Sequence, residues 1–315
     1  MNDTTIHIKH RPETLDAVVG QDTAVRSLAQ VLARKSSRAF LFTGPSGTGK
    51  TTLARIAARM VGCSPTEIKA GEHDAATNTR IDAMRAIQDM LEYRPIGGVV
   101  RVMIIDECHA LSKAAWQSVL KALEEPPSWA YWMLCTTEPA RVPVTAMTRC
   151  VHYVLKPVVQ PMLIELIERV AAAEKIRLGD DASQIVGLCA REAGGSPRQA
   201  LVNLAVCAGV RTAAEARDLL RSAEQSRDAV ELARALVRGA RWPEVQGLLR
   251  DLQDVGPESI RHVVRAYVTK VVLGANSEKG AARGMYILDA FSEPCAPQDG
   301  ISPIVMACGR VVLGD

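Results

Sequence analysis

The chain has 315 residues, a formal net charge of +3, 48% hydrophobic residues and only 4% aromatic residues. This length predicts two or three domains with largely aliphatic cores, and the small net charge excludes a strong global attraction to nucleic acid. The N-terminus does not resemble a signal peptide and no apolar run reaches the about 18 residues that span a bilayer. We therefore expect a cytoplasmic protein, in the host cytoplasm if it is viral.

The first strong element is a buried strand predicted over 39–43, followed by a loop and a helix from residue 52. The loop fits the phosphate-binding pattern G-x-x-x-x-G-K-[ST]. Its residues are Gly44, Pro45, Ser46, Gly47, Thr48, Gly49, Lys50 and Thr51. In such a loop backbone N–H groups surround phosphate oxygens, the lysine reaches the β- and γ-phosphates, and the threonine hydroxyl binds Mg²⁺. A chance glycine-rich turn is the alternative, but the strand–loop–helix order favours a nucleoside triphosphate site.

A second buried strand is predicted over 99–105 and ends in Asp106 and Glu107. An acidic residue at such a strand end holds Mg²⁺, and an adjacent carboxylate polarises the attacking water. We assign Asp106 to the metal and Glu107 to the water, with an acidic helix cap as the alternative. His109 has no second ligand at helical spacing, so we interpret it as structural.

Two further strands are predicted over 130–136 and 150–155, and Pro157 then marks a boundary because proline disfavours helix in the residue before it. A small helical bundle follows, whose last helix has Ser196 as N-cap and Pro197 at its first position. The remaining pattern is helical. The predicted domains are 1–157 (α/β, nucleotide-binding), 158–218 (helical) and 219–315 (helical).

The eight cysteines show no C-x-x-C spacing, and several lie in apolar runs. This usage is typical of buried thiols in a reducing compartment. We expect no structural zinc and no structural metal besides Mg²⁺.

The order of motifs resembles that of AAA+ ATPases of the DNA polymerase clamp-loader family, to which the bacterial gamma/tau subunit and the replication factor C subunits belong. The matching segments are Arg11-Pro12, Val18-Val19-Gly20-Gln21, the phosphate loop, Asp106-Glu107, Leu123-Glu124-Glu125-Pro126-Pro127, Thr137, Pro143-Val144-Thr145, Thr148-Arg149-Cys150 and Gly195-Ser196-Pro197-Arg198. The resemblance is dense over 11–205. It implies an α/β AAA+ domain with a parallel sheet, then a helical lid and an all-helical collar that joins subunits into a ring, which we expect to be a pentamer.

The resemblance also implies roles for individual residues. Thr137 matches sensor 1, near the γ-phosphate, although a strand-ending threonine is its default interpretation. Arg198 matches sensor 2, which couples lid closure to nucleotide because its guanidinium grips phosphate oxygens. Arg149 matches the arginine finger that acts on a neighbouring subunit's ATP, so the active ATPase is expected to be an oligomer. Val18 and Val19 belong to the adenine-side segment.

Two departures from the bacterial pattern are visible. The four-cysteine zinc module is absent, since Cys63 stands alone after the phosphate-loop helix, which favours a compact version like replication factor C or a viral one. Thr148 replaces the usual serine and keeps the hydroxyl.

A DNA-facing helix is expected to start at Asp74 and continue to Arg85, by the same resemblance. Arg80, Arg85 and Lys113 are candidate contacts to a phosphate backbone, with solvated surface cations as the alternative. The expected function is an ATPase, stimulated by DNA and clamp, that loads a sliding clamp onto primer–template DNA. The alternatives are another DNA-acting AAA+ motor, such as a branch-migration helicase or fork remodeller, and a subunit that binds ATP without hydrolysing it.

Overall fold

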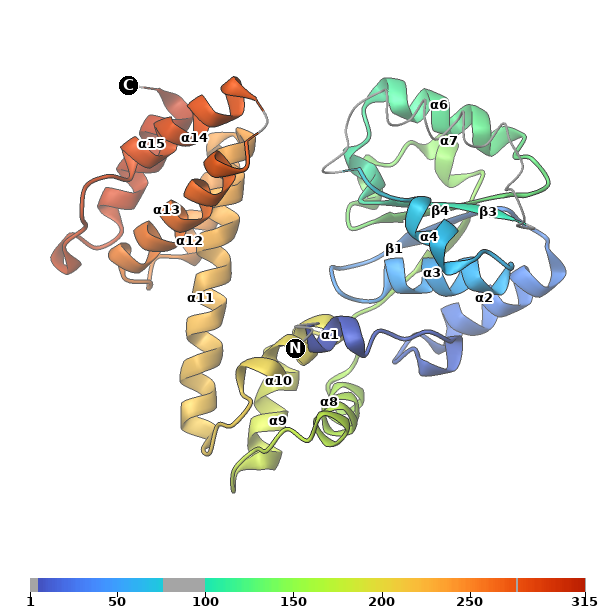
Figure 1. The fold of residues 1–315 in the computed structure, drawn as a ribbon, viewed down its shortest axis with the longest axis horizontal. Helices are drawn as coiled ribbons and strands as arrows, with labels where there is room; N and C mark the ends of the chain where they lie inside the picture. Colours follow the sequence, from blue (N-terminus) through green and yellow to red (C-terminus); the bar gives the residue numbers. More distant parts are fainter. Residues whose placement is uncertain (1–4, 76–99, 276, 315) are drawn as a thin grey trace. The chain divides into compact units, whose positions relative to one another are not determined.

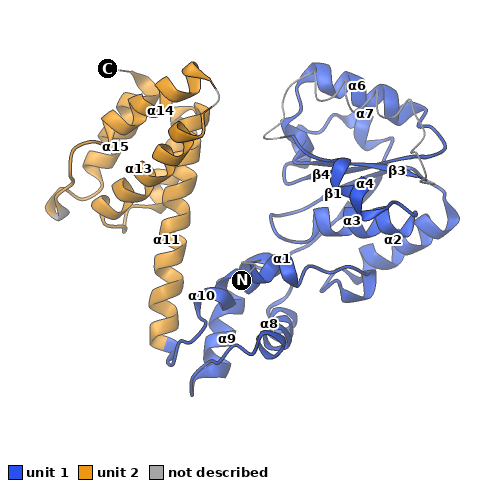
Figure 2. Ribbon diagram, in the orientation of Figure 1, with its two compact units in different colours: residues 1–213 blue, residues 214–315 orange. Residues whose placement is uncertain are grey.

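The computed structural model describes residues 5–75, 100–275 and 277–314. The chain divides into two compact units, residues 1–213 and 214–315, coloured separately in Figure 2. The sequence boundary expected near 218 falls inside helix α11 (Ala213–Arg238). The boundary expected after residue 157 lies within the first unit and remains a prediction.

The first unit contains a five-stranded parallel sheet with the order β2-β3-β4-β1-β5. The strands are β1 (Ala39–Thr43), β2 (Glu72–Asp74), β3 (Arg101–Asp106), β4 (Ala130–Thr136) and β5 (Val151–Val154). The predicted parallel α/β class is thereby confirmed. The helix start expected at Asp74 is wrong, because this residue pairs in register with Asp106 as the end of β2.

Helices cover both faces of the sheet, as Figure 1 shows. On one face lie α2 (Asp22–Arg34), α3 (Lys50–Met60) and α4 (Pro65–Ala70), and on the other lie α6 (Lys113–Glu124) and α7 (Val144–Met147). All seven residues of β4 are buried, and successive side chains enter opposite cores: Trp132 and Leu134 on the α6 side, Tyr131 and Met133 on the α3 side. This alternation follows from the period of two in a strand.

The remaining helices among the described residues of the first unit are α1 (Ile6–Lys9), α8 (Gln160–Glu174), α9 (Ala182–Arg191) and α10 (Pro197–Val206). Short 3₁₀ turns are η1 (Leu15–Ala17), η2 (Cys108–Ala110) and η3 (Pro139–Arg141). Helix α10 begins as predicted: Pro197 is its first residue, and the Ser196 side chain accepts a hydrogen bond from the Gln199 N–H.

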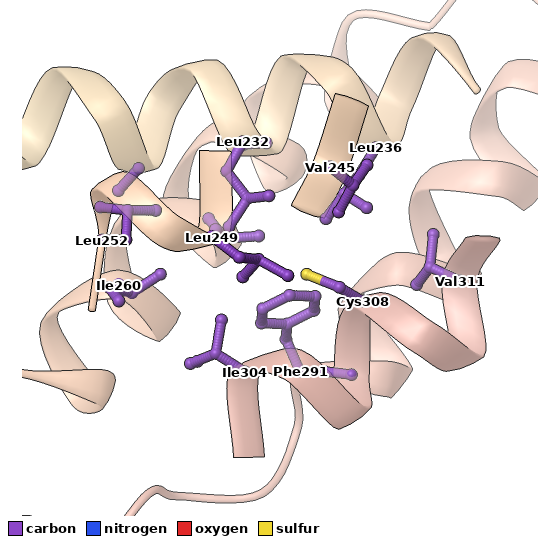
Figure 3. Close-up of a cluster of buried hydrophobic side chains, with 14 of the residues drawn as sticks. Leu232, Leu236, Val245, Leu249, Leu252, Ile260, Phe291, Ile304, Cys308 and Val311 are labelled. Carbon is purple, nitrogen blue, oxygen red and sulfur yellow. The ribbon is translucent and has the colours of Figure 1, made fainter. Parts of the chain in front are cut away.

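The second unit consists of helices around one apolar core. Its elements are α11, α12 (Trp242–Asp251), α13 (Pro257–Leu273), α14 (Glu278–Ala290), η4 (Pro297–Asp299) and α15 (Ser302–Leu313). In Figure 3, Leu249, Phe291, Ile304 and Cys308 converge at the centre of this core. Across the described residues of both units, no helix combines the length and apolar character needed to cross a membrane.

Candidate functional site

The loop between β1 and α3 has the backbone shape of a phosphate-binding loop. Gly44 has φ +141° and Gly47 has φ +75°, conformations that L side chains rarely adopt. A Cβ atom at Gly44 would lie 2.3 Å from the carbonyl oxygen of Leu155, so a side chain has no room there. The loop leads directly into α3, whose N-terminal N–H groups and dipole favour an anion.

Lys50 is folded back over this loop and is only 6% exposed. Its Nζ donates to the carbonyl oxygens of Gly44 and Pro45, each at 2.9 Å. Burial lowers the pKa of Lys50, while the carboxylates of Glu107 and Asp106 act in the opposite direction. The ammonium is therefore held at the loop, close to the acidic end of β3.

Two oxygen ligands meet where α3 faces the end of β3. The Thr51 hydroxyl donates to Oδ2 of Asp106 at 2.8 Å, and the other carboxylate oxygen of Asp106 accepts the Glu107 N–H at 3.1 Å. Hydroxyl and carboxylate oxygens are ligands that Mg²⁺ prefers. Thr51 and Asp106 thus fit the metal role expected of them.

Glu107 and Thr137 come together at the carboxyl ends of adjacent strands. Oε2 of Glu107 accepts a hydrogen bond from the Thr137 hydroxyl at 2.9 Å and from the Thr137 N–H at 3.2 Å. Glu107 has φ +46°, an unusual value for a residue other than glycine, and such strain often accompanies a functional position. Parallel strands direct their carboxyl ends to one edge of the sheet, which explains the encounter.

One pocket of the first unit is lined by Lys50, Thr51, Asp106 and Glu107 together with residues of α8 and α10, while Thr137 is not among its described lining residues. The predicted residues Val18, Val19 and Arg198 line it with the phosphate loop, Asp106 and Glu107. Sequence reasoning missed other lining residues: His7, His10, Thr52, Leu166, Arg169 and Leu201. None of these positions carries a motif in the sequence. The N-terminal segment is tied to α8 by His10, whose Nε2 lies 2.5 Å from Oε1 of Glu174.

Cationic side chains concentrate around the phosphate end of the pocket. Burial, then the nearby Arg55 and Arg198, lower the pKa of Arg11, while Glu72 and Asp106 oppose this shift. Arg11 lines the pocket beside Lys50. Grouped cations of this kind are stabilised by an anion, and a polyphosphate supplies several negative charges.

The remaining predicted residues lie elsewhere. Arg149 is not among the described residues that line the pocket: it donates to Oε1 of Glu124 at 2.5 Å and to the Thr145 carbonyl oxygen at 2.7 Å. Lys113 is exposed as the first residue of α6. Arg80 and Arg85 lie outside the described residues. Within the described ranges, no cluster of three or more His, Cys, Asp or Glu side chains could hold a metal ion.

Known proteins are similar to this chain over about three fifths of its length. A family model described as DNA polymerase III, delta subunit, matches residues 66–159. The DNA polymerase III subunit tau of Escherichia coli is 35% identical over 213 residues, which are 61% of this chain and 33% of that protein. The tau subunit of Bacillus subtilis is 33% identical over 211 residues, 61% of this chain and 37% of that protein. The matched part of this chain is similar to the gamma and tau subunits of bacterial DNA polymerase III.

Two further matches concern the share of each protein that is covered and the fold. The gamma subunit of Buchnera aphidicola is 32% identical over 221 residues, 64% of this chain and 59% of that protein. The chain thus spans from about a third to three fifths of the length of these relatives. A solved RuvB variant from Thermotoga maritima has a TM-score of 0.54 at 20% identity, and the match covers 77% of this chain and 85% of that chain, which shows a shared fold.

Proposed function

We propose that the chain is an ATP-driven motor subunit of a loader that opens a sliding clamp and places it on primer–template DNA. The observation that carries this proposal is the convergence of Lys50, Thr51, Asp106, Glu107 and Arg198 on one pocket. Similarity to the gamma and tau subunits selects clamp loading among the activities that such a pocket supports.

The phosphate loop would bind ATP through its backbone N–H groups, and Lys50 would exchange its two loop carbonyls for phosphate oxygens. Val18 and Val19 would flank the base. Thr51 and Asp106 would hold Mg²⁺, which when bound neutralises charge on the phosphates. Arg198 approaches from α10, so its contact with phosphate would close the lid over the nucleotide.

Glu107 would act as the group that orients and polarises the attacking water. Its Oε2 is held by the hydroxyl and N–H of Thr137, which fixes the orientation of the carboxylate. A carboxylate in hydrogen-bond reach accepts a proton as the water oxygen attacks the γ-phosphorus. Thr137 would thus orient the carboxylate, and its position near the γ-phosphate and the attacking water remains a prediction.

Arg149 would complete the site of a neighbouring subunit. It is partly exposed on the connection between β4 and β5 and pairs with Glu124, so a neighbour can take it over by exchanging one anion for another. We assign residues 219–315 to the subunit collar of a pentameric ring. Backbone contacts to DNA are assigned to Arg80, Arg85 and Lys113.

ATP hydrolysis measured with and without primed DNA and a sliding clamp tests the proposal. We expect stimulation by both together, and loss of hydrolysis in Lys50→Ala. Glu107→Gln should bind ATP and fail to hydrolyse it. Hydrolysis by Lys50→Ala at the wild-type rate, or the same rate with and without DNA and clamp, would remove the proposal. Strand displacement or branch migration without a clamp would support the motor alternative instead.

Mixed assemblies test Arg149 separately. A subunit with Arg149→Ala keeps its own pocket, and a subunit with Lys50→Ala keeps its finger, so mixing the two inactive variants should restore hydrolysis. Each variant alone should lose about 10³-fold or more in rate. Arg191→Ala, which removes an exposed, ion-paired arginine on α9, is the matched control. Failure of the mixture to regain activity would place Arg149 outside the neighbour's site.

A further inference from the structure

His109 lies between the catalytic carboxylate and the surface of the first unit. It belongs to η2, and its side chain is 12% exposed. Nδ1 lies 2.9 Å from the hydroxyl oxygen of Thr136 and 3.3 Å from Oε2 of Glu107. On the other side of the ring, Nε2 lies 3.1 Å from Oε1 of Glu138. One imidazole therefore connects two carboxylates.

The surrounding hydrogen bonds fix the orientation of this ring. Nδ1 forms a hydrogen bond with the Thr136 hydroxyl, and Nε2 lies within ion-pair distance of Oε1 of Glu138. The Thr136 hydroxyl is fully buried and also accepts the N–H of Glu138 at 3.0 Å. A rotation of the His109 ring would break contacts with both Thr136 and Glu138. The ring is thus held from two sides while one edge faces Glu107.

The outer carboxylate belongs to an exposed segment. Glu138 is 51% exposed, and Nη1 of Arg141 lies 3.3 Å from each of its carboxylate oxygens. Both residues lie on the connection between β4 and β5, residues 137–150. The same connection carries Thr137, which holds Glu107 directly, and Arg149, the residue assigned to the neighbour's site. Displacement of this connection by a neighbour would reach Glu107 through Thr137 and through Glu138 with His109.

We propose that His109 is a positioning residue that links Glu107 to the β4–β5 connection, so that engagement of a neighbouring subunit at this connection adjusts the water-activating carboxylate. This inference rests on the proposed function, because it takes Glu107 as the group that activates water. Glu138 acts through the imidazole, and the imidazole acts through Oε2 of Glu107. His109 is not among the described residues that line the pocket.

Two amide substitutions separate the two ring nitrogens. His109→Asn places an amide near the position of Nδ1, and His109→Gln places one near the position of Nε2. The assay measures kcat, KM and the nucleotide Kd for both, with His262→Asn on the exposed face of α13 as the matched control. We expect His109→Gln to lower kcat by about 10- to 100-fold, because misplacement of a catalytic group by about 1 Å costs rates of that order. KM and Kd should stay within about twofold, and His109→Asn should recover part of the lost kcat.

A double-mutant cycle tests whether Glu138 works through the ring. Glu138→Gln should lower kcat in the presence of His109, and the same change in the His109→Gln background should have an effect of less than about twofold. Multiplicative effects of the two changes would overturn the link. So would a kcat unchanged in His109→Gln, or a Kd that rises in proportion to the loss of kcat, since a general loss of structure has that signature.

The failures of the two proposals are distinguishable. If Lys50→Ala keeps the wild-type rate of hydrolysis, the proposed function fails. If Lys50→Ala abolishes hydrolysis while the His109 variants hydrolyse ATP normally, only the positioning role fails. Circular dichroism of each variant identifies misfolding, and where His109→Gln does not fold, the cycle is carried out with His109→Asn.

Discussion

The substitution Gly47→Ala should destabilise the first unit, and the structure indicates two separate contributions to the loss of stability. Gly47 has φ +75°, where an L residue costs about 1–2 kcal/mol. Its Cβ would lie 2.0 Å from Oγ of Ser196 and 3.2 Å from the Ser196 Cβ. The Ser196 hydroxyl must therefore rotate away from the Gln199 N–H that it caps, which costs about 1 kcal/mol. The free energy of unfolding should fall by roughly 2–3 kcal/mol in total.

A double-mutant cycle isolates the part due to the cap. Ser196→Ala alone should cost about 1 kcal/mol, and Gly47→Ala with Ser196→Ala should cost no more than Gly47→Ala alone, because the cap is lost only once. The coupling free energy is then about −1 kcal/mol. Gly187→Ala on α9 is the matched control: its Cβ has nothing within 4 Å, so it should be neutral or stabilise by up to about 1 kcal/mol.

Urea denaturation without nucleotide measures these values. Trp116, Trp129 and Trp132 belong to the first unit and Trp242 to the second, so a Trp242→Phe background makes tryptophan fluorescence specific to the first unit. Additive costs, with a coupling smaller in size than about 0.5 kcal/mol, would refute the claim that Gly47 and Ser196 compete for the same space.

Three predictions concern the second unit. Leu249→Ala in its core should cost about 2–5 kcal/mol in urea denaturation followed by near-UV circular dichroism, and a cost below about 1 kcal/mol would contradict the observed packing. Hydrogen bonds from the Arg261 guanidinium, then from a backbone N–H, lower the pKa of Glu258 from 4.5 to about 2. The stability that the ionised Glu258 contributes is present above pH 4.5 and is lost as pH falls towards 2. Glu258→Gln should therefore make the free energy of unfolding depend less on pH in that window. An NMR titration that gives Glu258 a pKa near 4.5 would contradict this prediction. Burial raises the pKa of the Cys308 thiol to about 12. At pH 8 the alkylation of Cys308, mapped by mass spectrometry, should therefore be ~10³-fold slower in the native protein than in urea. Equal rates in the two conditions would show that the thiol is accessible.

The central strands and the phosphate site could be predicted because their signals are local. Strands β1 and β4 have the bounds expected from their apolar runs, and the predicted capping of α10 by Ser196 is confirmed. The contact of Asp106 with Thr51 follows from the parallel sheet, because Asp106 ends β3 and Thr51 stands in the first turn of α3, which the phosphate loop connects to the carboxyl end of β1. Strand β2 was missed because three residues, two of them acidic, carry no strand pattern.

Contacts that depend on tertiary packing could not be predicted from the sequence. His10 and Arg169 enter the pocket only because α1 and α8 pack around its rim, and neither position carries a motif. His109 was expected to be structural since no metal ligand accompanied it. Its neighbours Glu107 and Glu138 lie on different connections, so only the folded sheet brings the three together.

The complete burial of β4 has a consequence for the unfolded chain. Residues 130–136 form a seven-residue segment with high β-propensity, no charge and no proline, which is typical of segments that aggregate when exposed. In the folded unit β3 and β1 occupy both of its edges. Pro127 and Pro139 stand close to its two ends, as residues that limit strand extension do. Refolding of the first unit should therefore become less complete as protein concentration rises. The midpoint of its thermal unfolding then depends on the rate of irreversible aggregation as well as on the folding equilibrium.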